Sequence, residues 1–247
     1  MDVNNYILHL NELRTRVIRC SAVVLLLFLG LFLIDEVLYV FIARPLLTHL
    51  PIGNSIIATE VTATFMVPMK LALISAIFLA IPYLLYQLWS FVAPALYSNE
   101  KKQILPFLIS STFLFYGGVI FAFYIICPMA LSFFAKCAPP GVAVMADIKA
   151  YLDFVLTILF AGGLAFQVPI ITLALIQSGI ISIQQFEYFR PYVIVVAFIL
   201  GMLLTPPDVV SQILLALPMW WLFEVGLLIA KYREKGTDLL SYHSNTK

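Results

Sequence analysis

The sequence predicts an all-α membrane protein with six transmembrane helices. Hydrophobic residues make up 63% of its 247 residues, charged residues make up only 11%, and the mean hydropathy is +1.04. A soluble domain is nearer half apolar and a quarter charged, so this composition excludes a water-soluble core. We expect a single domain over residues 1–232 and a polar cytoplasmic tail over 233–247. The expected spans are six apolar runs at about residues 17–34, 65–92, 104–126, 151–176, 192–204 and 213–230.

The segment before the first run, residues 1–19, is polar and amphipathic, with apolar residues at three- to four-residue steps. We expect a helix that lies along the membrane surface and leads into the first span. A cleavable signal is not expected, because acidic residues interrupt the segment and no small-x-small site follows the apolar run. Glu12 and Arg16 lie four positions apart, so a local ion pair is the simplest interpretation of both.

Charge gathers next between the second and third runs, in residues 91–102. Pro94 is expected to stop the preceding helix, and Ser98-Asn99 offers polar caps for the next one. The simplest interpretation of Glu100 is therefore a capped helix start beside two lysines that set the topology. Lys70 lies near the beginning of the second run. We expect its ammonium group to extend toward the lipid headgroups, and a role inside the bundle is the alternative.

The last two spans look short or interrupted. The fifth run has thirteen residues, which reach about 20 Å as a helix and fall short of the roughly 30 Å hydrocarbon core. The sixth run contains Pro218 and Glu224. We expect Glu224 to reach the surface or to cap a neighbouring helix. Local thinning of the bilayer would accommodate both spans.

Lysine and arginine residues indicate the orientation of the spans. With six spans, the side that carries both termini has ten of these basic residues, and the other side has three. The more basic side is usually cytoplasmic, so both termini, Glu12 and Glu100 are expected inside. The long loops around Pro45 and Pro140 would then face outward. The net charge of +1 gives no reason to expect a nucleic-acid partner.

Three motifs stand at separate places along the chain. Residues 9–16 read His-Leu-Asn-Glu-Leu-Arg-Thr-Arg, residues 91–100 contain Phe-Val-Ala-Pro-Ala-Leu-Tyr and a following glutamate, and residues 201–212 contain Gly-Met-Leu-Leu-Thr-Pro-Pro-Asp and a following glutamine. They resemble the amino-terminal opening, the first cytoplasmic loop and the last periplasmic turn of the TatC family. The similarity covers about residues 6–232, with the six spans in the family's order.

This resemblance implies a function that composition does not show. TatC proteins are core subunits of the twin-arginine protein translocase in the bacterial inner membrane. They bind signal peptides with paired arginines on folded cargo, and they assemble with single-span TatA- and TatB-type partners and with other copies of themselves. Transport uses the protonmotive force, so we expect no enzyme activity, cofactor or metal. The sequence has no G-x-x-x-x-G-K-[ST], H-E-x-x-H or G-x-S-x-G motif.

The resemblance also implies an acidic receptor site on the cytoplasmic face. A guanidinium is planar, always charged and bidentate toward carboxylates, so two arginines would suit two separated carboxylates. Glu12 and Glu100 are the expected carboxylates, and Arg14 is expected to orient one of them or to repel wrong geometries. Apolar surface for the peptide residues that follow the arginines is expected from Phe91, Leu96 and Tyr97.

One position departs from the family pattern. Gln167 stands near mid-membrane where the family usually has a glutamate. A glutamine cannot titrate, so we do not expect an obligatory proton-carrying role at this position. Hydrogen bonding to a partner helix or to water, and simple packing inside the bundle, are both open interpretations.

The turn after the fifth run carries a second candidate surface. Met202, Thr205 and Gln212 match positions where the family docks partner helices. Asp208 follows two prolines, and its simplest role is to cap the sixth helix. Pro45 has a family counterpart that helps contact between subunits, although a structural break in the outer loop is the simpler interpretation.

Two other functions are compatible with six spans. A small-molecule secondary transporter would use polar residues near mid-depth, but no internal repeat is detectable and few charges lie in the spans. An intramembrane enzyme would need a catalytic pair in the membrane, and all three histidines lie outside the spans. Cys127 and Cys137 could pair, although space-filling thiols are the simpler interpretation.

Overall fold

The structure of the protein is a computed structural model, and it describes residues 3–34, 39–40, 42, 56–96, 104–137, 146–204 and 209–244. Six helical stretches within these ranges are long and apolar enough to cross a membrane: Leu10–Ile34, Ala63–Val92, Leu105–Phe134, Ile148–Gln177, Ile183–Leu203 and Gln212–Tyr232. The predicted helical fold with six spans is therefore confirmed. The last two spans are the shortest, with 21 residues each.

The chain folds into two compact units. The first consists of Met1–Thr112 and Leu131–Leu156, and the second consists of Phe113–Ala130 and Thr157–Lys247. The boundaries fall inside helices and not in loops, so the two units divide the third and fourth spans between them.

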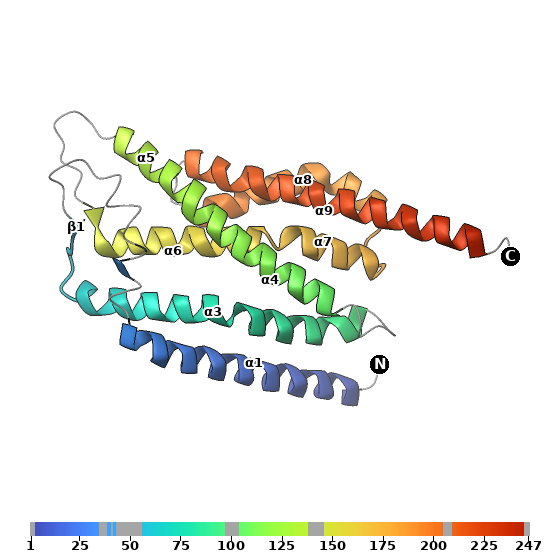
Figure 1. Cartoon of the computed structure of the whole chain (residues 1–247), viewed down its shortest axis with the longest axis horizontal. Coiled ribbons are helices and arrows are strands. Elements are labelled where there is room, and N and C mark those ends of the chain that lie inside the picture. The colour runs from blue at the N-terminus through green and yellow to red at the C-terminus, as the bar shows by residue number, and fades with distance from the viewer. Residues whose placement is uncertain are drawn as a thin grey trace. The chain divides into compact units, whose positions relative to one another are not determined.

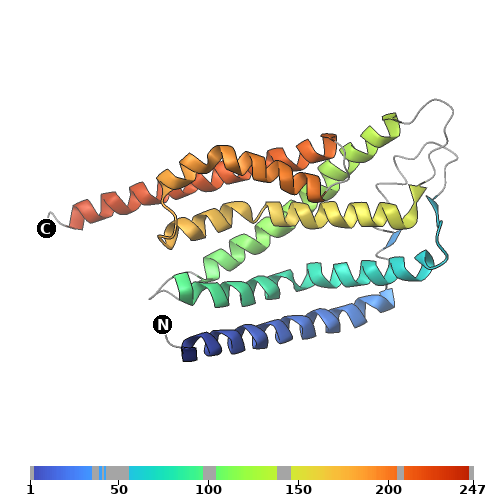
Figure 2. The same ribbon diagram turned by 180° about the vertical axis from the view of Figure 1, so that it is seen from behind.

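In the first unit, α1 (Val3–Leu31) lies along α3 (Ala63–Leu96), as both ribbon views show (Figure 1, Figure 2). The 3-10 turn η1 (Phe32–Ile34) follows α1. α1 contains no proline and a single glycine, Gly30, so nothing in its backbone interrupts the helix. The helix expected to lead from residues 1–19 into the first span is thus one continuous helix from Val3 to Leu31, and its position along the membrane surface stays a prediction.

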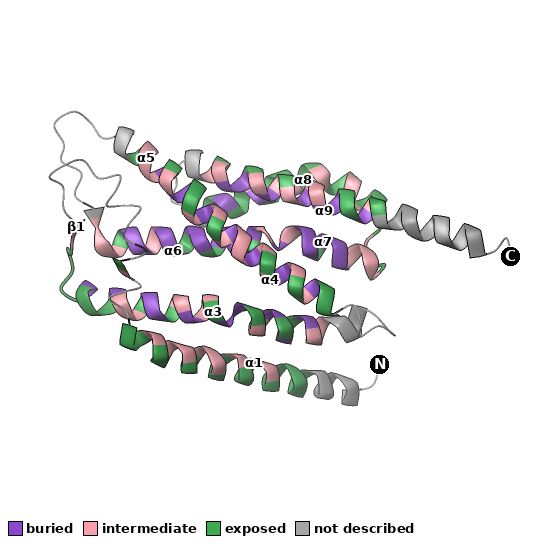
Figure 3. Ribbon diagram, viewed as in Figure 1, coloured by how far each residue is buried: buried purple, intermediate pink, exposed green. Residues whose placement is uncertain are grey.

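The two helices of this contact differ in burial. No residue of α1 whose burial is described is buried, whereas one face of α3 is (Figure 3). That face repeats every three or four positions, as expected of a helix packed on one side. Its buried residues are Ala63, Val67, Leu71, Ala72, Ala76, Ala80, Ile81, Leu85, Gln87 and Trp89. α3 ends at Leu96, two residues beyond Pro94, where we expected it to stop.

A pair of short strands closes the other end of the first unit. β1 (Ile56–Ile57) and β2 (Ala146–Asp147) run parallel, with Ile57 opposite Asp147. The Asp147 carboxylate accepts hydrogen bonds from the N–H groups of Lys149 and Ala150, and Thr59 N–H lies 3.4 Å from its Oδ1. Asp147 therefore caps the helix that begins after it.

The third span contains a π-helical turn next to Pro128. The span consists of α4 (Ile104–Phe121), the π-helical turn η3 (Ala122–Ile126) and α5 (Cys127–Cys137). Pro128 has no N–H, so the helix cannot keep its regular pattern there. The N–H of Cys127 instead donates to the carbonyl of Ala122, one residue further back than in an α-helix. The helical stretch therefore continues well beyond residue 126, where we expected it to end.

The fourth span breaks near its middle, between α6 (Ile148–Ala165) and α7 (Val168–Gln177). Pro169 lies in the first turn of α7, where a missing N–H is tolerated.

In the second unit, Gly162 of α6 comes close to Gly118 of α4. A Cβ atom on Gly118 would lie 2.3 Å from the Gly162 carbonyl oxygen, so only glycine allows this approach.

The second unit also contains α8 (Ile183–Leu204) and α9 (Val209–Ser244), which pack on each other. The expected thirteen-residue length of the fifth span was wrong, because α8 has 22 residues and reaches about 33 Å. Two charged residues in the first half of α8 form ion pairs with α9. Arg190 pairs with Glu224 at 3.0 Å, and Glu187 pairs with Lys231. α9 remains helical to Ser244, within the predicted tail.

Candidate functional site

Arg16 joins α1 to the carboxyl-terminal half of α3. Its Nε and Nη2 donate to Glu12 Oε1 at 3.0 and 2.6 Å, and its Nη1 donates to Gln87 Oε1 at 2.9 Å. Longer bonds of 3.3 Å run from Nη1 to the Gln87 carbonyl and from Nη2 to the Ser90 carbonyl. A guanidinium has five N–H groups, so these five bonds engage all of them.

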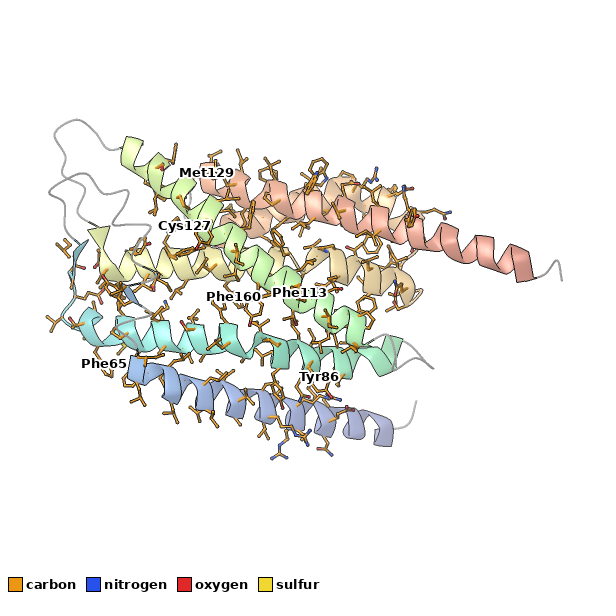
Figure 4. The ribbon with its side chains drawn as sticks, viewed as in Figure 1. Phe65, Tyr86, Phe113, Cys127, Met129 and Phe160 are labelled. Carbon is orange, nitrogen blue, oxygen red and sulfur yellow. The ribbon has the colours of Figure 1, made fainter. Side chains whose placement is uncertain are left out.

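This contact is more than a surface ion pair. The Arg16 side chain is 20% exposed, and that of Glu12 is 44% exposed. Gln87 is buried and donates its own amide to the Tyr83 hydroxyl at 2.9 Å. Figure 4 shows the side chains in this region, where the labelled Tyr86 precedes Gln87 on α3. The Glu12–Arg16 pair inferred from their spacing is therefore present, and it extends into a network between two helices.

A second contact in the same unit joins the end of α3 to the beginning of α4. The Trp89 indole N–H donates to the Ser111 hydroxyl at 2.9 Å, and the Trp89 ring stacks on Phe107 with 5.2 Å between the centroids. Trp89 and Ser111 are both buried. The segment 97–103 therefore connects two helices that are held to each other.

The residues predicted to form the receptor site fall into two groups. Glu12 and Arg14 are exposed on α1, and Phe91 is half-buried near the end of α3. Leu96 is the last residue of α3. Tyr97 and Glu100 lie outside the described residues, so the proximity of Glu12 and Glu100 stays a prediction.

The candidate docking surface lies where α8 and α9 meet. Met202 is 58% exposed on α8. Gln212 of α9 is half-buried and donates its amide to the Phe198 carbonyl at 3.0 Å. Gly201 permits this close packing, because a Cβ there would lie 3.2 Å from Gln212 Cγ. Three other predicted residues lie outside the described residues: Pro45, Thr205 and Asp208.

Comparison with known proteins identifies the family. The chain matches the family model described as Sec-independent protein translocase protein (TatC) over residues 8–218. The chain belongs to the TatC family. The TatC protein of Haemophilus influenzae is 49% identical over 239 residues, which cover 97% of this chain and 93% of that protein. The TatC protein of Escherichia coli K12 is 44% identical over 231 residues, which cover 94% of this chain and 90% of that protein.

Solved TatC structures have the same fold. A crystal structure described as that of the twin arginine translocase receptor TatC is 34% identical and has a TM-score of 0.81. The match covers 91% of this chain and 98% of that one. With its six spans, the chain is therefore a multi-pass membrane subunit of the Sec-independent protein translocase and not an enzyme. The resemblance carried by the three sequence motifs is confirmed.

In this TatC chain, Gln167 is part of the break between α6 and α7. The residue is buried, with 8% exposure. Its N–H donates to the Leu164 carbonyl at 2.9 Å, its carbonyl accepts from Ile171 N–H at 3.0 Å, and its side chain does not cap α7. The backbone of Gln167 therefore forms part of the break between the two helices, and the role of its side chain stays a prediction.

Sequence reasoning missed two ion pairs that bring distant segments together in the first unit. Lys70 donates to Asp153 Oδ1 at 2.7 Å, and Lys149 donates to Glu60 Oε2 at 2.6 Å. Lys70 thus pairs with α6 instead of extending alone toward the headgroups. Spacing along the chain gives no signal for either pair. Cys127 is free and buried, which fits the space-filling interpretation.

We predict that Gln167→Ala retains substantial transport of a twin-arginine cargo and that Gln167→Glu is tolerated. The physical reason is that the break is made by the backbone beside Pro169, and that a glutamine side chain cannot titrate and so cannot carry a proton in the wild-type protein. Export in cells that carry each variant, compared with the amount of assembled complex, measures this. Complete loss of transport in Gln167→Ala with normal assembly would show that the polar side chain is indispensable.

Proposed function

We propose that this chain is the receptor and core subunit of the twin-arginine translocase and binds signal peptides with paired arginines. The family membership supports a translocase role, and the matched crystal structure is described as a twin arginine translocase receptor. In this proposal the chain lies in the bacterial inner membrane with both termini cytoplasmic, as the distribution of basic residues favours. Transport draws on the protonmotive force and needs no cofactor.

The observation that carries the proposal is that the Glu12 carboxylate is accessible and is held in place by Arg16. It is partly exposed, and Arg16 holds it beside the last turns of α3. Both bonds from Arg16 fall on Oε1, and Oε2 accepts no hydrogen bond from the part of the chain that the structure describes. An incoming guanidinium would therefore find one carboxylate oxygen of Glu12 already oriented by its neighbour.

The second carboxylate in the proposal is Glu100. It follows the end of α3 by four residues, in the segment between two helices that Trp89 ties together. Two arginines in the peptide match two carboxylates better than a single pair would. Arg14 orients a carboxylate or repels peptides with the wrong geometry. Phe91, Leu96 and Tyr97 provide apolar surface for the residues that follow the arginines.

The outer turn is the proposed docking site for single-span partners of the TatA and TatB type. Met202 offers an exposed apolar side chain there, and Gln212 holds the two helices on either side of residues 205–208 together. Thr205 would add a polar contact, and Asp208 would cap α9. Pro45, in the other outer loop, would contribute to contact between copies of this chain.

We predict that Glu12→Ala and Glu100→Ala each weaken binding of a twin-arginine signal peptide to the solubilised complex roughly ten- to a hundredfold. Each change removes a charge-assisted hydrogen bond from one arginine. Equilibrium binding of matched Arg-Arg and Lys-Lys peptides measures the effect, with Glu60→Ala as a control at an exposed, ion-paired glutamate. If wild type binds both peptides equally and neither alanine change matters, the two glutamates are ordinary helix-end residues.

We also predict that a cysteine at Met202 crosslinks to a single-span partner helix in assembled complexes. The side chain is exposed next to the outer turn, where a foreign helix can approach it. Oxidation of the assembled complex in membranes, with a second cysteine placed in the partner's span to form the disulfide, followed by identification of the product by size and antibody, measures this. A cysteine at Leu228, which is 60% exposed elsewhere on α9, is the control. Efficient crosslinks only between copies of this chain would indicate a self-assembly surface instead.

A further inference from the structure

The geometry points to Arg16 as a positioning residue for the signal-peptide site. Its guanidinium donates to the Ser90 carbonyl, which the N–H of residue 94 would bond if that residue were not proline. The same guanidinium holds Glu12 beside α3. The inference rests on the proposed receptor function, and it adds a residue that acts through Glu12 without contacting the peptide.

The first step is the missing backbone donor. In an α-helix the N–H of residue 94 would donate to the carbonyl of Ser90, but proline has no N–H. α3 nevertheless continues through Pro94 to Leu96. Inside a membrane protein an unpaired carbonyl is costly. The Ser90 carbonyl instead accepts from Arg16 Nη2 at 3.3 Å, so a side chain of α1 takes the place of the lost amide.

The second step is that this contact needs an arginine. The guanidinium reaches Glu12, Gln87 and the Ser90 carbonyl at the same time because its five N–H groups point in fixed, different directions. A lysine has the same charge, but its three donors share one nitrogen on a flexible chain. Lysine can therefore keep the ion pair with Glu12 and still lose the bonds to α3.

The third step connects Arg16 to the site. Glu12 stands on α1, and the chain leaves α3 at Leu96 toward the segment that carries Glu100. Arg16 is bonded both to Glu12 and to the last turns of α3, so it holds the Glu12 carboxylate beside the helix end that carries Phe91. Arg19 is also on α1, but it is exposed and makes no hydrogen bond to the residues that the structure describes. It provides a matched control.

The test uses the full chain in its complex with partners, purified in detergent, and a fluorescent twin-arginine signal peptide as probe. We expect Arg16→Lys to weaken peptide binding roughly tenfold, the size of one charge-assisted hydrogen bond. We also expect faster amide hydrogen exchange in residues 86–96, because the end of α3 loses its extra donor. Arg19→Lys should change either quantity by less than about twofold.

A second pair of variants tests the shared carbonyl. Pro94→Ala returns an N–H that can donate to the Ser90 carbonyl within α3. In the Pro94→Ala protein, Arg16→Lys should weaken peptide binding by at most about threefold. The reason is that the Ser90 carbonyl there keeps a donor, the N–H of residue 94, when the arginine is lost. Additive effects of the two changes would show that Arg16 and residue 94 do not serve the same carbonyl, and would overturn the inference.

The two readouts separate the possible failures. If Arg16→Lys speeds exchange in residues 86–96 but leaves peptide binding unchanged, Arg16 supports the helix without positioning the site. That result overturns this inference and leaves the receptor function intact. If the wild-type complex does not prefer the Arg-Arg peptide over a Lys-Lys peptide, the receptor function fails and the inference falls with it.

Discussion

A backbone carbonyl without a donor is costly inside a bilayer, and each proline in a span removes one donor. Three of the prolines in the spans of this chain illustrate three different solutions. At Pro128 the helix widens into a π turn, and near Pro169 the span breaks at residues 166–167. At Pro94 the helix continues, and Arg16 of a neighbouring helix donates to the Ser90 carbonyl. The candidate receptor face is built on the third of these solutions.

The same arginine also holds the carboxylate of Glu12, the residue that we propose binds the signal peptide, in place. Glu12 already accepts two hydrogen bonds from Arg16 in the resting protein, at 3.0 and 2.6 Å, so its side chain is not free to rotate. Holding a binding group in place before the ligand arrives reduces the entropy that binding must offset. The partial exposure of Glu12 and the network through Gln87 thus both belong to the contact between α1 and α3.

Much of the fold was predictable from the sequence, because apolar length and proline positions are local properties. The six spans and the Glu12–Arg16 pair are of this kind. Contacts between distant parts of the chain were not predictable. α3 continues beyond Pro94, where Arg16 of α1 bonds to the Ser90 carbonyl. Lys70 pairs with Asp153, which is 83 positions away. The receptor role of Glu100 came from motif resemblance, since spacing alone favours a capped helix start.

The proposed receptor function requires a twin-arginine peptide to bind beside Glu12 of α1 and the end of α3. Site-specific photocrosslinking in native membranes tests it most directly, with a photoreactive residue at Leu13 or Leu96 and a control at Leu217, which is 50% exposed on α9. We expect an Arg-Arg precursor to crosslink at Leu13 and Leu96 and not at Leu217, and a Lys-Lys precursor to crosslink weakly at all three. Equal crosslinking of both precursors, or crosslinking at Leu217 alone, would contradict it.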